Sequence, residues 1–141
     1  MIMETREPLV ALRQQGFSVS LVGCDSSGRV SVNEIEAALT PETLCISIQQ
    51  ANNETGVRQP IDEICNLLQA HEAFFHVDGA QGYGKDIDVL RNRRIDLLSI
   101  SAHKIYGPKG VGALISRRRG YDSIPLKPLF YGGGQERGLR P

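Results

Sequence analysis

The sequence lacks several features that would place it in other classes of protein. Its formal net charge is zero, so neither sign is in excess to attract a nucleic acid or an anionic membrane. No apolar run approaches the roughly 18 residues that a membrane-spanning helix needs. Charged residues begin at Glu4, and the first seven residues contain no apolar core of a signal peptide. These absences predict a cytoplasmic protein with no nucleic-acid partner and no membrane partner.

Cysteine is also scarce, with three residues in the chain. Cys24, Cys45 and Cys65 lie about twenty residues apart and form neither a CxxC pair nor a zinc-binding spacing. This usage fits a reducing compartment and predicts no metal site. Cys45 falls on an expected strand and Cys65 on the apolar face of an expected helix, so both are predicted to be buried and unreactive. Cys24 falls in an expected turn.

What the sequence does contain is the composition of a globular domain: 141 residues, of which 40% are hydrophobic and 23% charged. Hydrophobic periodicity predicts helices at 7–15, 32–39 and 60–70, and strands at 17–22, 43–48, 74–77, 95–101 and 111–116. Ser31 with Glu34 three residues later is a capping box for the second helix. Strands that alternate with helices predict right-handed βαβ units, and therefore an α/β fold with a mainly parallel sheet.

Polar residues follow three of these expected strands: segment 52–56, then Asp78 with Gln81, then His103 with Lys104. Ligands of parallel sheets bind beyond the carboxyl ends of the strands. A lysine at such a strand end can form a Schiff base with an aldehyde cofactor, and an aspartate can pair with a protonated pyridine nitrogen. Lys104 and Asp78 together therefore predict pyridoxal phosphate. Taken singly, Asp78 could instead be a helix N-cap and His103 a structural histidine.

Four motifs occur in order along the chain: Ala-Asn-Asn-Glu-Thr-Gly at 51–56, His-Val-Asp-Gly-Ala-Gln at 76–81, Ser-Ala-His-Lys-Ile-Tyr-Gly-Pro-Lys-Gly at 101–110, and Gly-Gly-Gly-Gln-Glu-Arg-Gly-Leu-Arg-Pro at 132–141. From about Glu7 onward the sequence resembles the cysteine desulfurases and the related selenocysteine lyases, which are class V aminotransferases of pyridoxal-phosphate fold type I. The resemblance implies a three-layer α-β-α fold. Residues 1–141 would be a single partial domain, the central portion of the large cofactor-binding domain of a homodimer.

The resemblance also implies two catalytic residues. Lys104 matches the lysine that holds pyridoxal phosphate through a Schiff base and later moves the α-proton of the substrate. Asp78 matches the aspartate that keeps the pyridine nitrogen protonated, so that the ring acts as an electron sink.

Four further residues match cofactor contacts of the family. Gln81 and Asn53 match groups that hydrogen-bond the phenolic oxygen or contact the ring face. Ser101 and His103 match the pair that binds the cofactor phosphate. His76 lies on the strand itself and receives no role.

The implied reaction converts L-cysteine to L-alanine and leaves the sulfur as a persulfide on an enzyme cysteine. That sulfur would pass to an acceptor protein for iron–sulfur cluster assembly, tRNA thiolation or another transfer pathway. One alternative is a selenocysteine lyase acting on L-selenocysteine. Another is a truncated, non-catalytic homologue that acts only by binding a partner.

The sequence departs from the family pattern in three respects. The histidine that stacks on the ring would fall near Ile2, and the loop with the nucleophilic cysteine and the carboxylate-binding arginine would follow Pro141. None of the three cysteines matches the catalytic one. We therefore expect an inactive fragment of a cysteine desulfurase with an exposed sheet edge or face.

Overall fold

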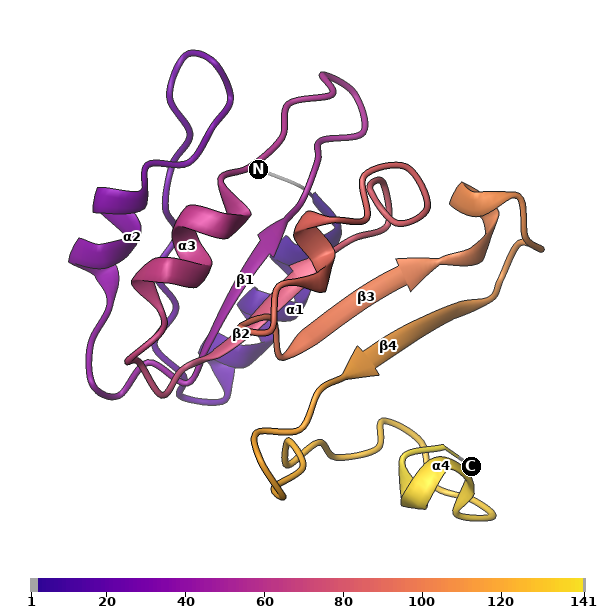
Figure 1. Ribbon diagram of the computed structural model, residues 1–141. Helices are drawn as coiled ribbons and strands as arrows, with labels where there is room; N and C mark the ends of the chain where they lie inside the picture. The colour runs from indigo at the N-terminus through magenta and orange to yellow at the C-terminus, as the bar shows by residue number, and fades with distance from the viewer. Residues whose placement is uncertain (1–2, 141) are drawn as a thin grey trace.

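The computed structural model describes residues 3–140 (Figure 1). Its elements follow one another in the order α1 (Met3–Gln14), α2 (Val32–Ala38), β1 (Cys45–Gln49), α3 (Ile61–Leu67), β2 (Phe74–Asp78), the 3-10 helix η1 (Val89–Arg91), β3 (Leu97–Ser101), the 3-10 helix η2 (Ala102–Ile105), β4 (Gly112–Ser116) and α4 (Gln135–Gly138).

The four strands form one sheet in the order β1-β2-β3-β4. β1, β2 and β3 are parallel, and β4 returns antiparallel to β3. The register aligns Gln49 with Asp78, and Asp78 with Ser99. The predicted α/β class with a mainly parallel sheet is therefore confirmed, and the first three strands end at the same edge.

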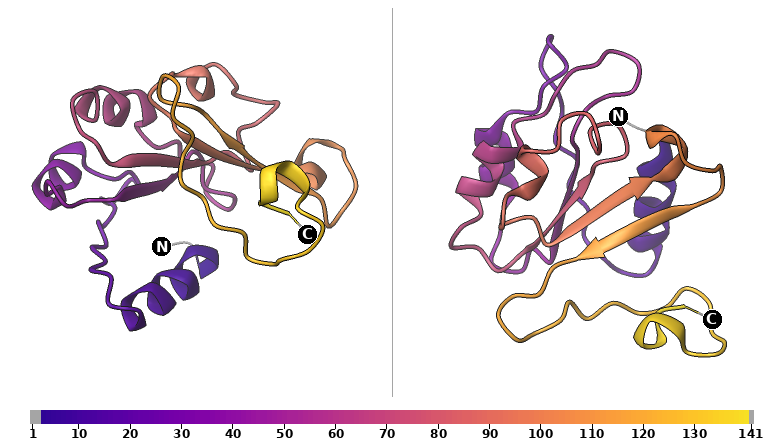
Figure 2. Two further views of the ribbon diagram at one scale, coloured as in Figure 1. Left: turned by 90° about the horizontal axis from the view of Figure 1, so that it is seen from below. Right: turned by 45° about the vertical axis from the view of Figure 1, so that its right-hand side comes forward.

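The hydrophobic core lies between the sheet and the helices α2 and α3. β2 alternates in burial, with Phe75 and Val77 fully buried and the residues on either side of them half-buried. The core residues that pack together are Ile35, Ile61, Ile64, Cys65, Leu68, Phe75, Val77, Leu90, Ile95 and Leu98. α1 lies on the opposite side of the sheet and apart from it, which gives the layer order α-β-α (Figure 2).

Most predicted elements form with slightly different ends. The cap of α2 is as expected, because the hydroxyl of Ser31 accepts the backbone N–H of Glu34 at 3.3 Å. The strand predicted at 17–22 is wrong: this segment forms no regular element and pairs with no strand of the sheet. Alternation of apolar and polar residues favours a strand only where a neighbouring strand can accept its hydrogen bonds. The one bridge nearby joins Cys24 and Val30.

Of the two cysteines predicted to be buried, only one is buried. Cys65 is buried in α3, whereas Cys45 is exposed, which corrects the prediction. Cys45 begins β1 at an edge of the sheet, on the face turned away from α2 and α3, so no helix covers it. Among the described residues no helix is both long and apolar enough to cross a bilayer.

Candidate active site

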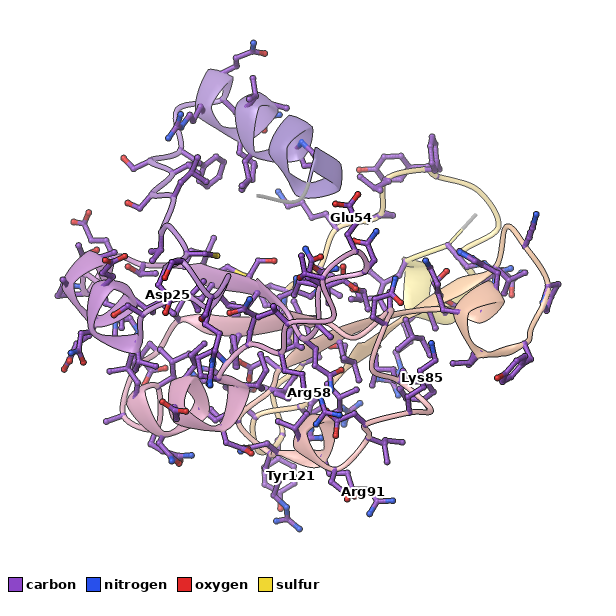
Figure 3. The ribbon with its side chains drawn as sticks, turned by 90° about the horizontal axis from the view of Figure 1, so that it is seen from above. Asp25, Glu54, Arg58, Lys85, Arg91 and Tyr121 are labelled. Carbon is purple, nitrogen blue, oxygen red and sulfur yellow. The ribbon has the colours of Figure 1, made fainter. Side chains whose placement is uncertain are left out.

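The loop after β1 is a compact hairpin at the carboxyl edge of the sheet. A bridge joins Ala51 to Arg58, and the side-chain oxygen of Asn52 accepts the N–H groups of Glu54 and Thr55, both at 2.9 Å. Asn53 is exposed in this loop. Figure 3 looks down on this edge and labels Glu54 in this loop and Lys85 in the next loop.

The loop after β2 is fastened to the end of β1. Gln50 is buried (1% exposed), and its side-chain Nε2 donates to the carbonyl of Asp86 at 2.8 Å. Arg58 also pairs with the carboxylate of Asp86 at 3.3 Å. A Cβ at Gly82 would overlap the side-chain amide of Gln50, so the loop approaches Gln50 as closely as only glycine allows. These contacts fix the path of the loop that carries Gln81.

The turn after β3 carries the lysine. Lys104 lies in η2 and is half-buried. Just before it in the chain, the hydroxyl of Ser101 lies 2.9 Å from Nδ1 of His103, within hydrogen-bond distance. The turn closes when the N–H of Gly107 bonds to the carbonyl of Ala102 at 2.8 Å. A Cβ at Gly107 would lie 2.9 Å from the Cβ of Ala102, which explains the glycine after Lys-Ile-Tyr.

Asp78 ends β2 beside this turn and is held through one of its two oxygens. Its Oδ1 accepts the N–H of Ala80 at 2.9 Å and the hydroxyl of Ser99 at 3.4 Å. No described residue donates a hydrogen bond to Oδ2. The carboxylate is thus fixed in orientation, with one oxygen left for a further donor.

Sequence reasoning missed a histidine in this site. His76 points to the same face as Asp78, and its Nδ1 lies 2.8 Å from the hydroxyl of Ser47, while its Nε2 lies 3.2 Å from the hydroxyl of Ser99. Loss of hydration lowers the pKa of His76 below its ordinary value, against the opposing charge of Asp78. The sequence did hold a signal for this group. Side chains alternate between the two faces of a strand, and His76 and Asp78 lie two residues apart on β2, with Ser47 paired to His76 on β1.

The structure brings some predicted site residues together and leaves others apart. Asp78 faces Ser99 across β2 and β3, and β3 continues into Ser101, His103 and Lys104. The second and third loops touch, since a Cβ on Gly84 would lie 3.1 Å from the side chain of Ile105. No described contact joins Asn53 or Gln81 to the other predicted residues.

Two cavities lie elsewhere. One, of about 360 Å³, is lined by residues that include Gln50, Arg58 and Asp86, and the other, of about 300 Å³, lies by Arg94 and Asp96; neither is lined by Asp78 or Lys104. Residues 3–140 contain no group of three or more His, Cys, Asp or Glu side chains that could hold a metal ion. The predicted chemistry therefore rests on the strand ends and their loops.

Comparison with known proteins finds relatives that match nearly the whole chain. Residues 5–139 match the family described as aminotransferase class-V. A probable mitochondrial cysteine desulfurase of Schizosaccharomyces pombe is 51% identical over 95% of this chain, and the mitochondrial cysteine desulfurase of Saccharomyces cerevisiae is 50% identical over 92% of it. In each case the match covers 26% of the relative.

Solved structures agree with this result. The crystal structure of DndA from Streptomyces lividans superposes with a TM-score of 0.90 at 49% identity, covering 96% of this chain and 38% of that one. A structure of SspA in complex with cysteine superposes with a TM-score of 0.83 at 42% identity, covering 95% of this chain and 38% of that one.

The chain belongs to the class V aminotransferase family of pyridoxal-phosphate fold type I. Within that family it groups with the cysteine desulfurases, as its motifs predicted. The chain spans about a quarter of the length of the curated relatives it matches.

One prediction is overturned by these relatives. The absence of a signal peptide and of a membrane-spanning run predicted a cytoplasmic protein, but the relatives named above are mitochondrial cysteine desulfurases. The match covers 26% of each of these relatives, so the missing apolar stretch in residues 1–7 does not decide the location, and the cytoplasmic prediction is wrong.

Proposed function

We propose that this chain is a cofactor-binding portion of a pyridoxal-phosphate-dependent cysteine desulfurase, whose substrate is L-cysteine and whose products are L-alanine and enzyme-bound sulfur. The observation that carries the proposal is the carboxylate of Asp78, held by Oδ1 and open at Oδ2, on the strand beside the one that leads to Lys104. Half the residues are identical to those of named cysteine desulfurases, and SspA is described in complex with cysteine.

The donor set fits pyridoxal phosphate. When bound, this group supplies a cationic ring that withdraws electrons from the α-carbon of an amino acid. A protonated ring nitrogen is an N–H donor with positive charge, and Oδ2 of Asp78 is the acceptor without a partner among the described residues. Such a charged hydrogen bond is short and strong, and it keeps the nitrogen protonated.

Lys104 supplies the amine of the proposed site. Its Nζ would anchor the aldehyde carbon of the cofactor and would carry a proton to and from the substrate. η2 follows β3 directly, and the tight turn at Gly107 restricts where the lysine can reach.

Ser101 and His103 would hold the phosphate. The Ser101 hydroxyl and the His103 ring are already in contact at 2.9 Å, so both are positioned at the start of η2. Gln81 and Asn53 would contact the phenolic oxygen or the ring face from the two neighbouring loops. These roles require each loop to turn its polar group toward Asp78.

We also propose that the 141-residue chain does not desulfurate L-cysteine by itself. The reaction needs a thiolate to receive sulfur, and burial raises the pKa of Cys65 to about 12. The pKa of Cys45 is also raised, because its sulfur is partly desolvated even though the residue as a whole is exposed, and because the charge of Asp96 opposes ionisation. Cys24 is exposed, but the neighbouring Asp25 lies well to the side of Glu54 and Lys85 in Figure 3.

Two other functions have less support than a cysteine desulfurase. A selenocysteine lyase is not favoured, because the relatives named above are cysteine desulfurases. A non-catalytic homologue that only binds a partner would still form the lysine adduct described next, because a Schiff base needs only an accessible amine. It would be distinguished by the lack of turnover in a complete enzyme that carries this segment.

The test of the proposed site is chemical trapping. The purified chain is mixed with pyridoxal phosphate, reduced with borohydride, digested and mapped by mass spectrometry. We expect the pyridoxyl group on Lys104, and we expect Lys104→Ala to lose it while Lys109→Ala retains it. A main adduct on Lys85 or Lys109 would show that the site is misassigned.

The activity of the chain is tested separately. Alanine and sulfide are measured after adding pyridoxal phosphate, L-cysteine and a thiol reductant. We expect no rate above that of free pyridoxal phosphate. A rate well above it would mean that the chain contains a sulfur-accepting thiol, and Cys24→Ser would show whether it is the exposed one.

A further inference from the structure

The four polar side chains on the open face of the sheet form one continuous hydrogen-bonded row. Ser47 on β1 contacts Nδ1 of His76 on β2 at 2.8 Å, Nε2 of His76 contacts Ser99 on β3 at 3.2 Å, and Ser99 returns to Asp78 at 3.4 Å. The row crosses three strands and ends on the carboxylate of the proposed site.

The direction of every hydrogen bond in this row is fixed by counting protons. The carboxylate of Asp78 only accepts, so the single hydroxyl proton of Ser99 must point to Asp78. Ser99 then has no proton left for His76 and must accept from it, which places the imidazole proton on Nε2. Nδ1 is left as an acceptor, and Ser47 donates to it.

A neutral imidazole is needed for this pattern, since a protonated ring would donate from both nitrogens. The surroundings favour neutrality: loss of hydration lowers the pKa of His76, although the nearby carboxylate of Asp78 acts in the opposite direction. The charged group near the imidazole of His76 is therefore Asp78, the same carboxylate that ends the hydrogen-bonded row.

We propose that His76 is a positioning residue for Asp78: as the neutral Nε2–H tautomer it directs the Ser99 hydroxyl to Oδ1, which leaves Oδ2 for the cofactor nitrogen. The role of Oδ2 toward the cofactor nitrogen rests on the proposed function, whereas the tautomer of His76 and the hydrogen-bonded row do not. Ala80 N–H and Ser99 O–H together occupy Oδ1, so the carboxylate cannot rotate without losing both.

The experiment reads the tautomer in the chain without any cofactor. Side-chain ¹⁵N–¹H correlation spectra of the ¹⁵N-labelled protein distinguish Nε2–H from Nδ1–H rings. His76→Gln identifies the signals of His76. We expect the neutral Nε2–H form at pH 7.5, and an Nδ1–H or doubly protonated ring would overturn the proposal.

Two serine variants form a matched pair. Ser47→Ala removes a donor to Nδ1 and should retain the Nε2–H form. Ser99→Ala removes the acceptor and should raise the Nδ1–H population of His76 roughly fivefold, the equivalent of one hydrogen bond. Equal spectra for the two variants would refute a row that runs from Ser47 to Asp78.

His71 is the internal control. Its Nδ1 accepts the N–H of Ala73 at 3.0 Å and its Nε2 donates to the carbonyl of Thr40 at 3.1 Å, so it is also an Nε2–H ring but touches neither serine. Its signals should not move in Ser99→Ala. Failure to trap pyridoxal phosphate on Lys104 would remove the proposed function and leave this result unchanged, so the two can fail separately.

Discussion

The two ends of the same sheet hold two aspartates in opposite ways. At the carboxyl edge Asp78 is bonded through Oδ1 alone. At the amino edge Asp96 is 4% exposed, and its oxygens accept from the N–H of Phe75 at 2.7 Å, from Arg94 at 2.6 Å and twice from Arg119 at 2.8 Å. One carboxylate is saturated by the fold, and the other retains an oxygen for a ligand.

The saturated edge joins segments that are distant in sequence. Arg94 also donates to the carbonyls of Leu68, His71 and Ala73, and Arg119 stacks over the ring of Phe74 at 4.8 Å. The cluster thereby ties α3, β2, β3 and the segment after β4 together. We infer that stability is concentrated at this edge, whereas the opposite edge holds unsatisfied groups for chemistry.

The largest effect is expected from removing the saturated carboxylate. Asp96→Ala removes the carboxylate that pairs with both arginines and accepts the N–H of Phe75, and breaking a buried ion pair costs about 3–5 kcal/mol. Urea unfolding followed by circular dichroism measures the loss, and the milder Asp96→Asn covers the case in which the alanine variant does not fold. Asp78→Ala, the matched control, should cost about 1 kcal/mol or less. Similar losses of unfolding free energy for the two variants would show that the two aspartates do not differ in their contribution to stability.

The next effect concerns function. In a complete enzyme that carries this segment, Asp78→Ala should lower turnover by about 10² to 10³, because it removes charge stabilisation at the ring nitrogen. Cofactor content should fall much less, since the lysine and phosphate contacts remain. Turnover near that of the unsubstituted enzyme, with the cofactor bound, would show that Asp78 is not the electron-sink partner.

The sequence was sufficient to predict the carboxyl edge of the sheet, with Asp78 and Lys104, but not the amino edge, where Asp96 is saturated by hydrogen bonds. Asp78 and Lys104 follow apolar strands within recognisable motifs, so their placement followed from parallel-sheet topology. Asp96 lies inside an apolar run, and Arg119 belongs to a basic run that is typical of a solvated strand end. Their pairing depends on β4 turning back antiparallel, which local pattern does not encode. The segment 17–22 failed for the same reason, because a strand depends on a partner.

A smaller effect tests whether part of the open edge is also rigid. Gly82→Ala would place a methyl group on the side-chain amide of buried Gln50, and overpacking of this kind costs about 1–3 kcal/mol. Gly23→Ala is the control, because no atom lies within 4 Å of the added Cβ. Urea midpoints of the two variants, compared with the unsubstituted chain, measure the difference. Combining Gly82→Ala with Gln50→Ala should recover part of the loss if the overlap is its cause.

The smallest effect separates the two edges by pH. The pKa of His76 lies below its ordinary 6.5 in the folded chain, so its stabilising contribution is complete above that value and is lost as the pH falls through the folded pKa.

Asp96 follows the same sign at lower pH. Burial alone would raise its pKa, but hydrogen bonds from Arg119 and Phe75 and the charge of Arg94 outweigh this and lower it below 3.8. Its contribution is present above 3.8 and is lost as the pH falls through the folded pKa. Stability of the chain should therefore decline in two steps on acidification, measured by urea midpoints between about pH 8 and pH 3. His76→Gln should remove the first step and keep the second, because the side chain of His76 bonds to Ser47 and Ser99 and not to Asp96 or its two arginines. If His76→Gln leaves the step below pH 6.5 in place, that step belongs to another group, and His76 is not held neutral by the open face of the sheet.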